Sequence, residues 1–214
     1  SDDTLTVTDS SFTQNSADSS GAIGVLASGS SAPTNLDISN STFTSNEATS
    51  GFGGAISLGS TTISQSFGEL TIQNSVFEYN EAQNSSSAHG GAILVNTDAN
   101  SDIVIAETLF QENSADSSGG ALYFTGAQST TIGQVSIVRS WFVENEASSP
   151  ASYERFGGAV SVYNAEEVLL NNLIFCGNEV TQFPNMTASG GGVYLGDIEE
   201  VEINNIIFQE NSSD

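Results

Sequence analysis

The chain has 214 residues, of which 26 are acidic and only two are basic, so its formal net charge at pH 7 is −24. A charge of this sign and size disfavours nucleic acid and anionic membrane surfaces as partners. The single cysteine excludes an internal disulfide framework. No apolar run is long enough to span a bilayer, so we expect no direct membrane insertion.

Two short signatures alternate along the chain from its first residues to its last. The first is Phe-x-x-Asn, which recurs every 31–34 residues at Phe12/Asn15, Phe43/Asn46, Phe77/Asn80, Phe110/Asn113, Phe142/Asn145, Phe175/Asn178 and Phe208/Asn211. The second is Gly-Gly-Ala followed by Ile, Leu or Val, with copies that begin at Gly53, Gly90, Gly119, Gly157 and, with Gly in place of Ala, Gly190. A period of this length indicates a solenoid or a propeller.

Within each unit, the residues before the Phe alternate between apolar and polar. Leu70 and Ile72 precede Phe77 in this way, which predicts a short strand with one buried face. Three positions before the Phe stands most often an Asn, such as Asn74, which predicts a corner because Asn tolerates the left-handed backbone region. A second strand then carries the Phe inward. A third follows the paired glycines, which allow a turn with positive φ or a close backbone approach.

Three short strands, three corners and about 33 residues per unit predict an all-β fold, a right-handed parallel β-helix (solenoid) of about six to seven coils. We expect residues 1–214 to form a single β-helix domain, either a mature product or a segment of a longer repeat array. In this fold the seven Phe should stack and the seven Asn should form a ladder of hydrogen bonds. A propeller is disfavoured because its blades need about 40–50 residues, and the recurring Leu scaffold of leucine-rich repeats is missing.

The repeated Gly-Gly-Ala-(Ile/Leu/Val) together with Phe-x-x-Asn resembles the repeat of the chlamydial polymorphic membrane proteins, over residues 5–211. The resemblance implies a secreted β-helical segment, displayed on a cell surface and used in adhesion. We therefore expect an extracellular or cell-surface location.

The residue directly before each Phe should point outward, because the Phe points inward. From the third unit onward this position is apolar, which predicts an exposed stripe made by Val76, Leu109, Trp141, Ile174 and Ile207. A contiguous exposed apolar surface usually marks an interaction site, and Trp is favoured at its centre, so Trp141 is the expected anchor. The alternative is that a loop, a bulge or the corner itself hides these residues.

Two further kinds of site are suggested by short motifs. Asp98, Asn100 and Asp102 alternate like the first ligands of an EF-hand loop, but the Gly at the sixth position and the Glu at the twelfth are missing. This pattern leaves a weak Ca²⁺ site open against a solvated turn, and no other cofactor is expected. Four Asn-x-Ser/Thr triplets are possible glycosylation sites, at Asn40, Asn84, Asn185 and Asn211.

The sequence favours a structural or adhesive function over an enzymatic one. Arg139 and Arg155 are the only basic side chains, too few for the cleavage of acidic polysaccharides. We expect head-to-tail stacking with identical chains or with neighbouring coils of the same fibre, and lateral binding of other surface proteins or glycans. The alternative is a polysaccharide-binding or -cleaving β-helix of the pectate-lyase-like type, which an aromatic groove near Tyr123, Tyr194 and Trp141 would favour.

Overall fold

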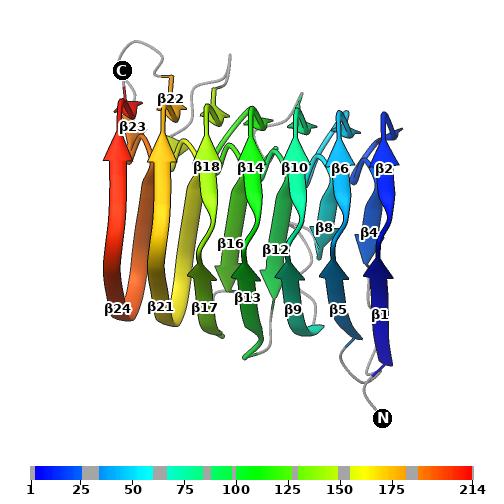
Figure 1. Cartoon of the computed structure of the whole chain (residues 1–214), viewed down its shortest axis with the longest axis horizontal. Coiled ribbons are helices and arrows are strands. Elements are labelled where there is room, and N and C mark those ends of the chain that lie inside the picture. The colour runs from blue at the N-terminus through cyan, green and yellow to red at the C-terminus, as the bar shows by residue number, and fades with distance from the viewer. Residues whose placement is uncertain are drawn as a thin grey trace.

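The computed structural model describes residues 3–25, 34–59, 67–83, 88–97, 100–126, 130–148, 155–181 and 188–213, and across these its regular secondary structure is entirely β. Strands pair in parallel with their counterparts one repeat away, which confirms the predicted parallel β-helix. In Figure 1 the nearer strands point upward, those behind point downward, and the coils advance from right to left, so the helix is right-handed. No helix that could cross a membrane is found in the described part of the chain.

The strands form four stacks, one more than the sequence predicts. The first stack holds β1 (Asp3–Thr8), β5 (Thr34–Ser39), β9 (Phe67–Gln73), β13 (Asp102–Ala106) and β17 (Ile132–Val138). The second holds the Phe-bearing strands β2 (Ser11–Thr13), β6 (Thr42–Thr44), β10 (Val76–Glu78), β14 (Leu109–Gln111) and β18 (Trp141–Val143). The fourth follows the glycines and holds β4 (Ile23–Val25), β8 (Ile56–Leu58), β12 (Ile93–Thr97) and β16 (Leu122–Gly126).

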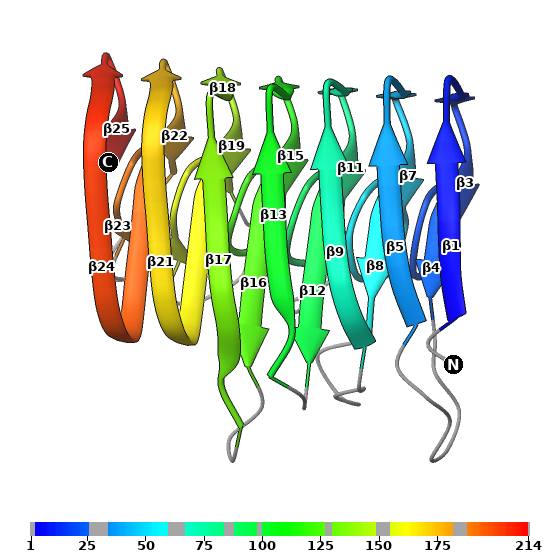
Figure 2. The ribbon, with the colours of Figure 1, turned by 60° about the horizontal axis from the view of Figure 1, so that its bottom comes forward.

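The third stack consists of two-residue strands directly after the Asn, and Figure 2 shows it behind the first. Its strands are β3 (Ser16–Ala17), β7 (Glu47–Ala48), β11 (Glu81–Ala82), β15 (Ser114–Ala115), β19 (Glu146–Ala147), β22 (Glu179–Val180) and β25 (Ser212–Ser213). The two remaining long strands, β21 (Val160–Cys176) and β24 (Val193–Gln209), continue the fourth, first and second stacks without a break. A short pair, β20 (Arg155–Phe156) and β23 (Ala188–Ser189), lies outside the stacks.

The core is a column of Phe rings flanked by aliphatic side chains. Neighbouring rings from Phe12 to Phe208 lie 4.7–5.1 Å apart between centroids and within 12° of parallel. The five inner rings, from Phe43 to Phe175, are fully buried. Each buried Phe contributes about 1.5–3 kcal/mol from the removal of its surface from water.

Beside the Phe column, the Asn side chains form the predicted ladder. Asn80 Nδ2 donates to Asn113 Oδ1 of the next coil at 2.9 Å and to the carbonyl of Phe43 in the previous coil at 2.9 Å. The backbone N–H of Asn80 donates to the same Asn113 Oδ1 at 3.1 Å. The pattern repeats from Asn15 to Asn211, so the buried amides are satisfied by one another and by the backbone.

A second ladder, of hydroxyl groups, was not predicted. It is made by Ser and Thr side chains two positions before the Phe. Such a hydroxyl accepts a hydrogen bond from the backbone N–H of the equivalent residue in the previous coil; Ser75 Oγ, for example, accepts from the Ser41 N–H at 3.1 Å. The same hydroxyl donates to the carbonyl two residues before it, as Ser75 does to Gln73 at 2.9 Å. Apolar Leu173 and Ile206 replace the hydroxyls in the coils of β21 and β24, where the strands run on unbroken.

The predicted corners adopt the left-handed backbone conformation. The residues three positions before the Phe all have φ between 47° and 56°, including Glu107 and Arg139, which favour this region less than Asn does. The paired glycines divide two tasks between them. Gly90 has a φ of 67°, whereas Gly91 provides room, because a Cβ on it would lie 2.0 Å from the carbonyl oxygen of Gly120 in the next coil.

Candidate functional site

The predicted apolar stripe lies at the surface of the second stack. Its five residues pair in register across β10, β14, β18, β21 and β24, so they form one row along the β-helix: Val76, Leu109, Trp141, Ile174 and Ile207. Trp141 is 44% exposed and Ile207 is 55% exposed, while the other three are partly buried. The row is therefore open to a partner at Trp141, its middle residue, and at Ile207 in the last described coil.

A groove of about 820 Å³ runs beside this row. One wall is made by Trp141, Ile174 and Ile207, and the other by the corner residues Asn74, Glu107, Arg139, Asn172 and Asn205. Arg139 pairs with Glu107 across adjacent coils at 2.9 Å, with both side chains about half exposed. An ion pair of this kind adds about 0–1 kcal/mol, so Arg139 and Glu107 contribute mainly by making this wall of the groove polar.

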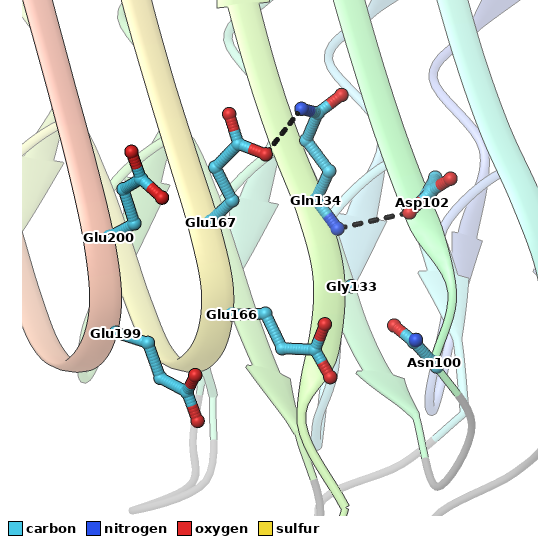
Figure 3. A pocket seen from close by; sticks show the side chains of 8 residues that line it. All are labelled: Asn100, Asp102, Gly133, Gln134, Glu166, Glu167, Glu199 and Glu200. Atoms are coloured by element: carbon cyan, nitrogen blue, oxygen red, sulfur yellow. Dashed lines mark hydrogen bonds between the residues drawn. The ribbon is translucent and has the colours of Figure 1, made fainter.

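Two residues of the expected Ca²⁺ motif line an acidic hollow of about 470 Å³, shown in Figure 3. Asn100 and Asp102 line it together with Glu166 and Glu167 of β21 and Glu199 and Glu200 of β24, while Asp98 lies outside the described residues. Asp102 Oδ1 accepts the backbone N–H of Gln134 at 3.0 Å, and Glu167 accepts from the Gln134 side chain at 2.8 Å. Within the described ranges no group of three or more His, Cys, Asp or Glu could hold a metal ion, so the Ca²⁺ site stays a prediction.

The glycosylation motifs occupy different environments. Asn40 is an exposed corner residue whose Oδ1 accepts from Asn74 at 2.7 Å. Asn211 belongs to the buried ladder, where it accepts from Asn178 at 2.8 Å and donates to the carbonyl of Phe175 at 2.9 Å. Its amide is thus already in use. Asn84 and Asn185 lie outside the described residues.

The aromatic residues named for the alternative function separate into two places. Tyr123 and Tyr194 line one hollow together with Phe156, Ser161 and Tyr163. Trp141 belongs instead to β18, which faces the viewer in Figure 1, whereas β16, the strand of Tyr123, lies behind it. Sequence analysis did not predict Phe156 or Tyr163 here; aligning all units by their glycines would place Tyr123, Ser161 and Tyr194 in one column.

His89 is held against this aromatic cluster. Its ring stacks on Tyr123 with centroids 4.1 Å apart, and its Nδ1 accepts the backbone N–H of Ser118 at 3.3 Å. Burial disfavours the charged imidazolium and lowers the pKa of His89 to about 4. The folded chain therefore keeps His89 neutral where an unfolded chain would protonate it.

This lowered pKa makes stability depend on pH. Between about pH 6.5 and 4 the unfolded chain binds a proton that the folded chain does not, so His89 should destabilise the fold progressively as the pH falls. We expect the free energy of unfolding of His89→Gln, measured with urea relative to that of the parent chain, to increase by about 2 kcal/mol when the pH is lowered from 7.5 to 5. The comparison with the parent chain removes the pH effects that both chains share. A difference that does not change with pH would contradict the lowered pKa.

These features define the chain as a parallel β-helix repeat protein with an apolar groove along one side. Residues 107–125, which run from the corner at Glu107 through Phe110 and Asn113 to β16, match the family described as the Chlamydia polymorphic membrane protein (Chlamydia_PMP) repeat. The resemblance inferred from the two signatures is confirmed for this unit, and the other units share its register. No curated protein and no solved structure gives a significant match to the chain.

Proposed function

We propose that the chain is a non-enzymatic structural and adhesive element of a cell surface, and that its apolar stripe binds a second protein or a neighbouring rod. The observation that carries the proposal is the row from Val76 to Ile207, in which the exposed Trp141 faces a groove with one polar wall. A continuous apolar row on a rigid β-helix fits a lateral partner better than a small substrate. The match to a membrane-protein repeat supports a cell-surface location.

Association along the axis is part of the same proposal. In the last described coil Phe208 is 54% exposed and Ile203 is 52% exposed, whereas their counterparts one coil earlier, Phe175 and Leu170, are buried. A further coil, from the same chain or from another, would bury these side chains and extend the Phe and Asn ladders. Surface glycans are a second class of lateral partner within this proposal.

The test replaces the anchor of the stripe. We expect the parent chain to self-associate with increasing protein concentration in sedimentation velocity, and Trp141→Glu to weaken this association about 30-fold, because a charge replaces a hot-spot aromatic. Thr42→Glu is the matched control: it stands at the same position of the coil, next to Val76 but outside the stripe. Association unchanged by Trp141→Glu would rule out the stripe as the interface. A parent chain that stays monomeric at every concentration would rule out self-association.

A further inference from the structure

The strongest unassigned site is the aromatic hollow on the opposite side of the β-helix from the stripe. It measures about 330 Å³ and is lined by Tyr123, Phe156, Ser161, Tyr163 and Tyr194. This volume is at the lower end of the range for small-molecule sites, roughly 300–1,000 Å³. Four of its five lining residues are aromatic.

The hollow is created by the register of three consecutive coils. Tyr123, Ser161 and Tyr194 are register partners on β16, β21 and β24, so the small Ser161 leaves space between two tyrosine levels. Tyr163 pairs with Gly196, where a Cβ would lie 2.7 Å from Cδ2 of Tyr163 and 3.0 Å from Cε1 of Tyr194. The absence of a side chain at Gly196 therefore lets the two tyrosine rings approach the backbone and each other.

Two of the rings are fixed by stacking. His89 stacks on Tyr123 with centroids 4.1 Å apart, and Phe156 stacks on Tyr194 with centroids 4.2 Å apart. Asp197 comes next to Tyr163 through the strand register, because it directly follows Gly196, the partner of Tyr163 on β24. A site whose rings are already ordered loses little conformational entropy when it binds a ligand.

The electrostatic environment selects the sign of the ligand. The hydrogen bond to Asp197 and the charge of its carboxylate raise the pKa of Tyr163. The whole chain adds a negative field, with a net charge of −24 and no Lys. Aromatic faces attract cations through their quadrupoles, most strongly where water is partly excluded.

We propose that this hollow binds an alkylated ammonium group such as that of choline, with the rings of Tyr123, Tyr163 and Tyr194 around the methyl groups and Asp197 as the counter-charge. A neutral sugar would stack on the same rings, and its hydroxyls can donate to the carboxylate, but it carries no charge for the carboxylate and the field to attract. Phosphorylcholine would be disfavoured as a ligand, because its phosphate is repelled by the acidic chain. The proposal is independent of the lateral stripe, which lies on the other side.

The test is calorimetric titration of the whole chain with choline and with its neutral isostere 3,3-dimethylbutan-1-ol. We expect choline to bind at least about tenfold more tightly than the isostere, since only the cation gains cation–π attraction. Phosphorylcholine should bind more weakly than choline. Equal binding of choline and its isostere would overturn the proposal, as would the absence of choline binding, or tighter binding of methyl β-glucopyranoside than of choline.

Variants locate the site. Tyr163→Ala and Asp197→Asn should each weaken choline binding about tenfold; Tyr163 is 41% exposed, so its removal leaves the core intact. Trp141→Ala, on the other side, is the control and should bind choline as the parent chain does. Arg155→Gln removes the basic residue next to Phe156 in the sequence and should leave binding unchanged or tighten it. If Trp141→Ala loses choline binding, or if Tyr163→Ala and Asp197→Asn both bind choline as tightly as the parent chain, the ligand lies elsewhere and the assignment is overturned.

Discussion

Replacing Asn113 by Ala should destabilise the β-helix by roughly 3–6 kcal/mol, because it removes four hydrogen bonds from a fully buried position. Asn113 Nδ2 donates to Asn145 Oδ1 at 2.9 Å and to the carbonyl of Phe77 at 3.0 Å. Its Oδ1 accepts the backbone N–H of Asn80 at 3.1 Å and the side-chain amide of Asn80 at 2.9 Å. Ala leaves these partners buried without the side chain that satisfies them.

Urea unfolding followed by the fluorescence of Trp141, the single Trp of the chain, measures this loss. Asn113→Asp separates hydrogen bonding from shape: it keeps the size of the side chain but loses the donors and places a charge among acceptors. The matched control is Asn15→Ala, because Asn15 is exposed and its side chain donates to Asn46 Oδ1 at 2.8 Å. We expect Asn15→Ala to cost less than about 1 kcal/mol. Equal costs at both positions would show that burial of the ladder does not determine its strength.

The repeat signatures predicted the fold because each has one physical purpose in every coil. Phe77 and Asn80 recur at a spacing that only stacking of equivalent residues satisfies, and Leu70 and Ile72 alternate with the period of a strand. The third stack was not predicted, since a pair such as Glu47–Ala48 has weak strand propensity and becomes a strand through pairing with Ser16–Ala17 and Glu81–Ala82 on either side. The hydroxyl ladder was missed because Ser41 and Ser75 look like ordinary polar residues in a Ser-rich chain.

The candidate sites depend on a different kind of information. Alternation alone places Trp141 on the outside, so the stripe could be predicted from its own strand. The polar wall of the groove and the aromatic hollow are set by neighbours on other coils, as with Tyr163 over Gly196, 33 positions away. Residue columns read across all units carry this information, but the side-chain directions that turn a column into a pocket arise only in the folded chain.

Gly120→Ala should be among the most damaging single substitutions in the chain, with a cost above about 4 kcal/mol or a loss of folding. A Cβ at this position would lie 2.1 Å from the carbonyl oxygen of Gly158 and 2.6 Å from backbone atoms of Glu146, both in the next coil. Backbone atoms cannot rotate away as side chains can, so the two coils must separate or lose register. Such a separation would also break the neighbouring bond from the Ala121 N–H to the Ala159 carbonyl, which is 2.9 Å long.

The control is Gly192→Ala. It makes the same change two coils away, at the third position of the Gly-Gly-Ala motif instead of the second. Gly192 stands where the other units have Ala, and a Cβ there would lie 3.2 Å from the ring of Phe208, which is exposed and able to shift. Gly192→Ala should therefore be neutral or stabilise the fold by about 0.4–1 kcal/mol, because it restricts the unfolded chain. Thermal unfolding followed by circular dichroism compares both variants with the parent. If Gly120→Ala unfolds at the temperature of the parent chain, the coils can widen at the glycine turn. The close carbonyl approach would then be a consequence of the coil spacing and not one of its causes.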